Sequence, residues 1–278
     1  MEDKRILVIG GTGYIGKEVC SELLKRGYFV SVLSRKLKES DKVKVLNGSV
    51  LDKGFLLRNL KNFDYVIYLA AVVKSLVKSR YSENITGLRN TIDAMERNNV
   101  SKLIYFSTQN VNIEKTGYYG NSKKECEKSL KESNLDYVII RPNYVYGVDM
   151  DNYFYRMINL IKKTKVCPVI GKGNQKIQPV NKKDLARITV DVIRHFRNKE
   201  IIEVSGKDTI SINEIIDFIR REGEYKFVKV HLPIKVLKLF KKVIPFDIDG
   251  FDEDRIIIEN NLSFAYNIKD DLRELIKL

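Results

Sequence analysis

The sequence has few of the residues that build metal centres and disulfide frameworks. Its 278 residues include three cysteines and two histidines, and Cys20, Cys126 and Cys167 lie far apart without a C-x-x-C pair. This spacing argues against a disulfide framework and against a zinc site. With only His195 and His231 in the chain, we expect neither a histidine-based metal site nor a Ser-His-Asp triad.

Long apolar runs are absent as well. No run approaches the roughly 18 apolar residues that a membrane-spanning helix requires. The charged residues 2–5 are followed by only a short apolar stretch, which does not match a signal peptide. Internal repeats, low-complexity runs and flexible linkers are also missing. We therefore expect a cytoplasmic protein with one large α/β domain, or a domain with a smaller appendage.

Positive charge is abundant, with a formal net charge of +14. Such a charge suits nucleic acid, an anionic membrane surface or phosphate-bearing small ligands. The lysines are scattered and form no aromatic-basic module, so we rank an anionic cofactor and substrate first and nucleic acid last. A lysine-rich proteome would give the same composition without functional meaning.

A glycine-rich turn follows the first apolar run, residues 6–9. Its spacing is G-x-x-G-x-x-G, with Gly10 at the turn, Gly13 where a pyrophosphate would approach, and Gly16 where a helix begins. An anion at this place would lie at the positive N-terminus of the helix. Although the spacing differs from the commonest dinucleotide fingerprint, the strand before it and the helix after it predict a nucleotide-phosphate site.

Strand and helix patterns then alternate as far as Gly147. The predicted strands are residues 29–33, 43–46, 65–71, 103–108 and 137–140. The alternation predicts an α/β fold with a Rossmann-type, doubly wound parallel sheet whose ligand lies at the carboxyl ends of the strands.

Beyond Gly147 the alternation changes, and we divide the chain there. Residues 1–147 are predicted to form an NAD(P)-binding domain to which residues 179–204 return. Residues 148–178 and 205–278 are predicted to form a smaller C-terminal substrate-binding lobe.

The end of the second strand bears on the choice of cofactor. An acidic residue there suits the ribose 2′-hydroxyl of NAD, and a basic residue suits the 2′-phosphate of NADP. This chain has Ser34, Arg35 and Lys36. We therefore favour NADP over NAD. Small Ala70 and Ala71 at the end of the strand at 65–71 would let the cofactor lie close.

Tyr119 and Lys123 lie four residues apart, on one face of a predicted helix. A nearby cation stabilises phenolate, so the tyrosine could exchange a proton with a substrate hydroxyl. Thr108, at the end of the preceding strand, offers a hydroxyl to the same oxygen. Tyr225 and Lys229 have the same spacing but no such setting.

With these residues in place, the chain resembles the short-chain dehydrogenase/reductase superfamily. The resemblance is to its extended and atypical branch, which contains the NAD-dependent epimerase/dehydratase enzymes. The matching segments are residues 10–16, 68–71, 83–87, 106–108, 119–123, 141–147, 170–173, 178–180 and 204–206, with Asp184.

The resemblance implies a role for each matching residue. Tyr119 would be the acid/base, Lys123 would lower its pKa and hold the nicotinamide ribose, and Thr108 would orient the substrate oxygen. Asn84 would support the active-site lysine through the backbone. The resemblance also suggests a homodimer through the helices around 84–98 and 119–131. The implied cofactor-binding residues are Gly10, Thr12, Gly13, Tyr14, Ile15, Gly16, Arg35, Val50, Leu69, Ala70, Ala71, Lys123, Pro142 and Asn143.

Two departures from the family pattern limit the function. Ser49 stands where many members have an aspartate, so the adenine end of the cofactor is held differently. Gln109 and Asn110 replace the Asp-Glu that sugar-nucleotide dehydratases share, which argues against 4,6-dehydration.

We therefore expect an NAD(P)-dependent epimerase of nucleoside-diphosphate sugars. One alternative is an NADP-dependent reductase or dehydrogenase of the atypical branch. Another is a non-catalytic NADP(H)-binding scaffold, because some atypical members bind cofactor without turnover. For that scaffold, the basic amphipathic residues 234–244 offer a membrane contact, although a helix packed on the substrate lobe is the favoured interpretation of this stretch.

Overall fold

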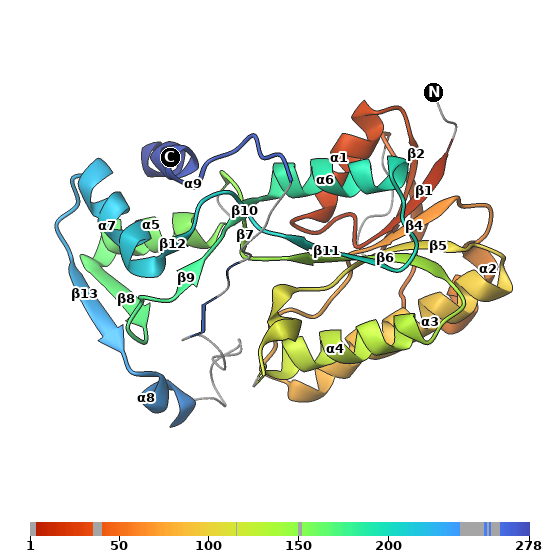
Figure 1. Cartoon of the computed structure of the whole chain (residues 1–278), viewed down its shortest axis with the longest axis horizontal. Coiled ribbons are helices and arrows are strands. Elements are labelled where there is room, and N and C mark those ends of the chain that lie inside the picture. The colour runs from red at the N-terminus through yellow and green to blue at the C-terminus, as the bar shows by residue number, and fades with distance from the viewer. Residues whose placement is uncertain are drawn as a thin grey trace.

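A seven-stranded parallel sheet forms the centre of the protein (Figure 1). The computed structural model describes residues 4–35, 41–114, 116–149, 152–239, 253–254, 256 and 262–278. The strand order is β11-β6-β5-β4-β1-β2-β3, and it reverses between β1 and β4. In such sheets ligands bind at this reversal, outside the carboxyl ends of the strands. The strands are β1 (Arg5–Ile9), β2 (Phe29–Ser34), β3 (Lys44–Asn47), β4 (Tyr65–Tyr68), β5 (Lys102–Phe106), β6 (Asp136–Pro142) and β11 (Glu200–Val204).

Helices cover both faces of this sheet, which confirms the doubly wound fold. In Figure 1, α1 (Gly16–Lys25) and α6 (Lys182–Arg194) lie above it. Below it lie α2 (Lys53–Asn59), α3 (Ser82–Arg97) and α4 (Tyr118–Lys131). Side chains alternate between the two faces of a strand, and all of residues 6–9 in β1 are fully buried. Their unbroken apolar run is the consequence of this double cover.

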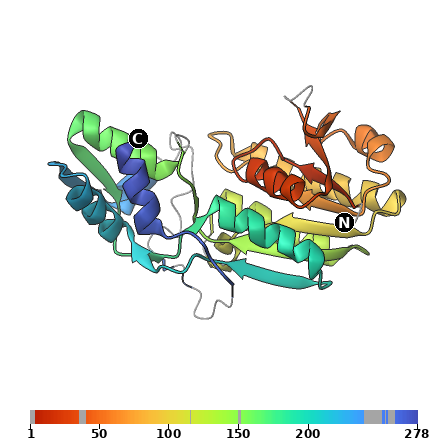
Figure 2. The ribbon, with the colours of Figure 1, turned by 90° about the horizontal axis from the view of Figure 1, so that it is seen from above.

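The second lobe is built from short strands and helices around its own core (Figure 2). It contains β8 (Val166–Ile170) paired with β13 (Val228–Leu232), and β9 (Lys176–Ile177) paired with β12 (Ile210–Ser211). Its larger helices are α5 (Tyr153–Thr164), α7 (Ile212–Glu222) and α9 (Ile268–Lys277), and α8 (Ile234–Leu239) follows β13. The boundaries that we drew between the lobes stay a prediction.

Two buried carboxylates fasten the C-terminal segment where β7 (Val145–Tyr146) pairs with β10 (Val180–Asn181). Asp271 of α9 accepts hydrogen bonds from the Tyr146 hydroxyl and the Asn181 amide, each at 2.8 Å. Asp184 accepts the backbone N–H of Tyr266 at 3.0 Å. These contacts join α9 to β7 and β10, and they join the residues just before α9 to α6.

Two predicted strands end earlier in the structure than in the sequence pattern. The strand predicted at 65–71 ends at Tyr68, and the one at 103–108 ends at Phe106. The chain leaves the sheet at both places to line the cavities described below, with apolar residues at 69–71 and with Ser107 and Thr108 after β5. Of the basic stretch 234–244, α8 covers the first six residues, and residues 240–244 lie outside the described part of the chain. Within the described ranges, no helix has both the length and the apolar character to cross a membrane.

Candidate active site

The glycine turn has the geometry that a bound phosphate requires. Gly10 has a φ of +87°, and a Cβ there would lie 2.8 Å from the backbone nitrogen of Ala70. A Cβ on Gly13 would lie 3.2 Å from the carbonyl oxygen of Gly10, a tight contact, and would face open space on its other sides. A Cβ on Gly16 would overlap that same carbonyl. No side chain caps α1, so the helix presents its N-terminus to this space.

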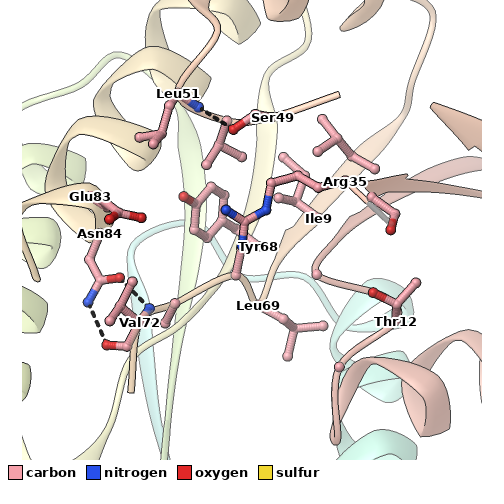
Figure 3. A pocket seen from close by; sticks show the side chains of 17 residues that line it. Ile9, Thr12, Arg35, Ser49, Leu51, Tyr68, Leu69, Val72, Glu83 and Asn84 are labelled. Carbon is pink, nitrogen blue, oxygen red and sulfur yellow. Dashed lines mark hydrogen bonds between the residues drawn. The ribbon is translucent and has the colours of Figure 1, made fainter. Parts of the chain in front are cut away.

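A cavity of about 410 Å³ lies beside this turn, at the carboxyl ends of β1, β2 and β4 (Figure 3). Arg35 enters it from the end of β2. Ser49 occupies the position where we expected a weaker adenine contact, and its hydroxyl accepts the backbone N–H of Leu51 at 3.2 Å. Val50 also lines this cavity.

Two further cavities continue from the first. The second, of about 540 Å³, shares Gly10, Gly13, Leu69 and Ala71 with the first. The third, of about 350 Å³, opens toward the second lobe and shares Tyr119 with the second. Every residue predicted for the site lines at least one of the three, which places them along one path.

The path can be followed by its lining residues. The first cavity is lined by Gly10, Thr12, Gly13, Arg35, Val50, Leu69, Ala70 and Ala71. The second adds Tyr14, Ile15, Gly16 and Lys123. Thr108, Tyr119, Pro142 and Asn143 line both the second and the third. Their roles in binding and catalysis stay predictions.

Lys123 is held deep behind this lining. Its side chain is 2% exposed, and its Nζ donates a hydrogen bond of 2.6 Å to the carbonyl oxygen of Phe106. The ammonium lies 4.7 Å from the ring centre of Tyr105 and 5.9 Å from that of Tyr119. Burial lowers the pKa of Lys123 to about 8, because a charged group loses hydration in the protein interior. The lysine is therefore still mostly protonated at neutral pH.

The acidity of Tyr119 differs from our expectation. We expected Lys123 to lower the pKa of this phenol, but burial raises it above its ordinary value. The buried phenolate would lose its hydration, and negative charge on Cys126 or Tyr81 would disfavour it further. The protein groups around Tyr119 therefore do not by themselves supply the expected lowering.

Asn84 acts close to Lys123 rather than on it. Its amide donates to the hydroxyl of Ser122 at 2.9 Å. The same side chain accepts the backbone N–H of Val72 at 2.6 Å and donates to the Val72 carbonyl at 3.1 Å. Asn84 thus fastens the loop after β4 to the residue that precedes Lys123 in α4.

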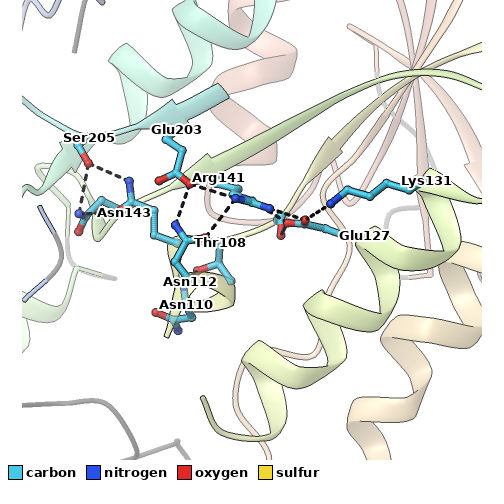
Figure 4. Close-up of polar contacts among 11 residues, drawn as sticks. Thr108, Asn110, Asn112, Glu127, Lys131, Arg141, Asn143, Glu203 and Ser205 are labelled. Atoms are coloured by element: carbon cyan, nitrogen blue, oxygen red, sulfur yellow. Dashed lines mark hydrogen bonds and ion pairs between the residues drawn. The ribbon is translucent and has the colours of Figure 1, made fainter. Parts of the chain in front are cut away.

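A buried ion-pair network that we did not predict lies behind the site (Figure 4). Glu127, one turn after Lys123, accepts two hydrogen bonds from Arg141, at 2.9 and 2.7 Å, and one from Ser107 at 2.6 Å. Burial alone would raise the pKa of Glu127, but the bonds from Arg141 and Ser107 lower it. Arg141 also bonds Glu203 at 3.1 Å. The network therefore joins α4 to β6, β11 and the residue after β5.

Asn143 belongs to a second buried cluster. Its amide donates to Gln109 at 2.7 Å, and Gln109 donates to the Ser205 hydroxyl at 3.0 Å. The side-chain oxygen Oδ1 of Asn143 accepts the backbone N–H of Tyr144 at 2.6 Å. Gln109, which sequence comparison marked as a departure from the dehydratase pattern, thus positions a residue of the cavity lining.

Sequence reasoning missed Lys74 and Tyr153, which line both the second and the third cavity. Lys74 carried a usable signal, since it follows a strand of the parallel sheet and such loops surround the ligand. Tyr153 carried none, because α5 reaches the site only through the packing of the second lobe.

Comparison with known proteins agrees with this geometry. Residues 6–205 match the model of the NAD dependent epimerase/dehydratase family. The chain belongs to this family. This match confirms the predicted resemblance, the prediction of an enzyme and the prediction of a nicotinamide cofactor. The choice of NADP over NAD stays a prediction.

The relatives with which the chain was compared have low sequence identity to it. The chain is 26% identical over 251 residues to a putative UDP-glucose 4-epimerase of Methanocaldococcus jannaschii. The aligned region covers 78% of this chain and 82% of that protein. It is 27% identical over 205 residues to the uncharacterized protein y4nG of Sinorhizobium fredii, covering 66% of this chain and about half, 52%, of that protein. Its fold is similar to the crystal structure of UDP-glucuronic acid 4-epimerase from Bacillus cereus in complex with NAD. There the TM-score is 0.78, the identity 23% and the coverage 98% of each chain.

Proposed function

We propose that this protein is an NAD(P)-dependent epimerase that acts on the hydroxyl-bearing carbon of a nucleoside-diphosphate sugar. The observation that carries the proposal is the position of Tyr119, which lines both the cavity continuous with the glycine turn and the cavity facing the second lobe. A phenol at this junction can reach a substrate hydroxyl while a cofactor lies beside the turn. Relatives named as UDP-sugar epimerases support this choice of substrate.

The proposed chemistry assigns one task to each side chain. A nicotinamide ring, when bound, would supply the hydride acceptor. As the phenolate, Tyr119 would take the proton of the substrate hydroxyl while a hydride leaves the same carbon, and would give the proton back when the hydride returns to the opposite face of that carbon. Thr108 would donate a hydrogen bond to the same oxygen. Lys123 places its positive charge next to Tyr119, and its hydrogen bond to Phe106 fixes that position.

The third cavity also fits a second candidate function. Its wall is largely apolar, formed in part by Tyr144, Val169, Ile170 and Ile212. This lining suits a substrate with an apolar face, as expected for an NADP-dependent reductase. Lys74, on the same cavity, would meet a diphosphate or another anionic group.

The deciding experiment is incubation with UDP- and dTDP-sugars and separation of the products. Epimers without a net change in nicotinamide absorbance support the epimerase, and net oxidation of NADPH by a carbonyl compound supports the reductase. Tyr119→Phe should abolish either activity, because the phenol carries the proton. Tyr118→Phe, a change at the exposed neighbour, is the matched control. Unchanged turnover in the Tyr119 variant would refute the assigned role, and cofactor binding with no turnover of any substrate would favour the scaffold.

Arg35 supports the proposal that NADP is preferred. It lines the first cavity beside Ser34, at the end of β2, where NAD-binding folds tend to carry an acidic residue. Arg35→Ser should weaken NADP binding by about tenfold, the size of one charge-assisted hydrogen bond, and leave NAD binding unchanged. Fluorescence titration of both nucleotides measures this. Equal affinities in the unaltered protein would contradict the preference.

The homodimer stays a prediction, and the structure gives it a testable form. The outward side chains of α3 and α4 include Arg89, Glu96, Lys128 and Glu132, all exposed. A dimer through this face would depend on paired charges and not on an apolar core. Sedimentation equilibrium at low and high salt should show dissociation as salt rises, and a monomer at low salt would overturn the prediction.

A further inference from the structure

Three large apolar side chains are exposed in one loop, which begins at the third cavity. Val73 is 51%, Leu76 57% and Val77 55% exposed. They lie in the loop between β4 and η1 (Lys78–Tyr81), and we call residues 73–80 the rim loop. Val73 and Lys74 of this loop line the third cavity. Clustered exposed apolar side chains of this kind mark an interaction surface more often than scattered single ones.

Hydrogen bonds hold the rim loop in this shape. Just before the loop, the Asn84 side chain bonds both the backbone N–H and the carbonyl oxygen of Val72. Within it, the Ser75 hydroxyl accepts the backbone N–H of Val77 at 3.1 Å. The Tyr81 hydroxyl accepts the backbone N–H of Ser75, also at 3.1 Å. The apolar side chains are therefore turned outward by a fixed backbone.

Positive charge is interleaved with these apolar side chains. Lys74, Lys78 and Arg80 are all exposed, and residues 73–80 include no acidic residue. The Lys78 ammonium lies 4.9 Å from the ring centre of Tyr118, at the start of α4. Arg80 is paired with Glu83 at 2.9 Å, which leaves Lys74 and Lys78 as the main charges for a partner.

We infer that the rim loop docks on an anionic lipid surface, with Val73, Leu76 and Val77 entering the boundary between headgroups and acyl chains. Basic side chains beside short apolar ones are the combination that interfacial binding uses, because the two attractions add. The net charge of +14 favours the same anionic partner. A second copy of this chain is a poorer occupant, since two rim loops would bring like charges together.

The location of the loop adds a consequence for the site. Docking there turns the mouth of the third cavity toward the lipid surface. In Figure 1, α8 and the start of α4 both lie along the lower edge of the view. Like the rim loop, α8 carries exposed basic and apolar side chains, Lys235 and Val236. This inference goes beyond the proposed function and does not rest on it, because binding is measured without substrate.

The test is co-sedimentation of the full chain with vesicles of phosphatidylcholine, with and without phosphatidylglycerol. We expect binding only with the anionic lipid, and weaker binding as salt rises. The double change Leu76→Ser and Val77→Ser should lower the partition constant by at least tenfold, and Lys78→Gln by about fivefold. The matched controls are Val228→Ser with Val230→Ser, two exposed valines of β13, and Lys128→Gln on α4.

Each outcome decides for or against the rim loop. The controls should change the partition constant by less than about twofold, with unaltered circular dichroism in all variants. Absence of binding to anionic vesicles, or an equal loss in the β13 controls, overturns the inference. Loss limited to Lys235→Gln with Val236→Ser would assign the contact to α8 instead. Self-association that the Leu76 and Val77 changes remove would identify a second copy as the occupant.

Discussion

The buried ammonium of Lys123 should make the stability of the protein depend on pH in a defined window. Its pKa is about 8 in the folded chain, against an ordinary value of 10.5. Between these two values the unfolded chain binds a proton that the folded chain has released. The free energy of unfolding must therefore rise with pH across this window. At about 1.4 kcal/mol per pH unit, the rise amounts to about 3 kcal/mol.

The perturbation that isolates this effect is Lys123→Met, which keeps the length of the side chain and removes its charge. Urea unfolding of the two proteins is followed at several pH values from neutral to above 10. The variant also loses the hydrogen bond to Phe106, but this loss shifts its stability by a nearly constant amount. Other titrating groups contribute equally to both proteins. The difference in unfolding free energy should therefore rise in favour of the unaltered lysine as the pH passes 8.

The result that refutes this reasoning is a difference that stays flat across the window. It would mean that Lys123 keeps an ordinary pKa, and hence that its cavity is better hydrated than its 2% exposure implies. A rise that begins well below pH 8 would instead mean that the lysine is already neutral at physiological pH. In that case it could not supply a positive charge to Tyr119.

Two paired substitutions test other parts of the site. Gly10→Ala should destabilise the fold by about 1–3 kcal/mol, because alanine is strained at the positive φ of this position. Gly13→Ala should cost less stability but should weaken cofactor binding. Thermal unfolding and nucleotide titration measure the two effects, and equal stabilities of the two variants would contradict the geometry of the turn. Arg141→Met should lower the free energy of unfolding by about 3 kcal/mol, because it leaves the buried Glu127 without its main partner. Lys131 lies 3.6 Å from the same carboxylate but is half-exposed, so Lys131→Met should cost less than about 1 kcal/mol. Similar losses in the two variants would show that the buried network adds no special stability.

Local patterns were sufficient to predict the sheet and the glycine turn at its edge. The fully buried run at residues 6–9, the turn at Gly10 and the alternation of strands and helices each depend on neighbours in sequence. The pairing of Tyr119 with Lys123 was also local, since both lie on α4. The second pair of this spacing, Tyr225 and Lys229, does not share a helix, because Lys229 belongs to β13 and pairs with Asp217. Of the two identical spacings, only that of Tyr119 and Lys123 places both residues on one helix.

Contacts between distant segments could not be predicted in the same way. Glu127 and Arg141 meet because α4 packs under β6, and nothing in the spacing of fourteen residues specifies that contact. The prediction of a lowered pKa for Tyr119 was wrong for a related reason. A sequence shows the favourable charge of Lys123 but not the burial that opposes it, and the sign of a pKa shift depends on which of the two is larger.

The residues proposed for the choice of cofactor and for proton transfer line different cavities. Arg35 lines the first cavity, whereas Tyr119 lines the second and third, and the two cavity groups meet at the glycine turn and at Leu69 and Ala71. Because the two side chains line different cavities, changes at the two places should be independent. Arg35→Ser should then alter which nicotinamide nucleotide binds without shifting the pH profile of turnover. A shifted profile would mean that the two ends of the path are coupled through the turn itself.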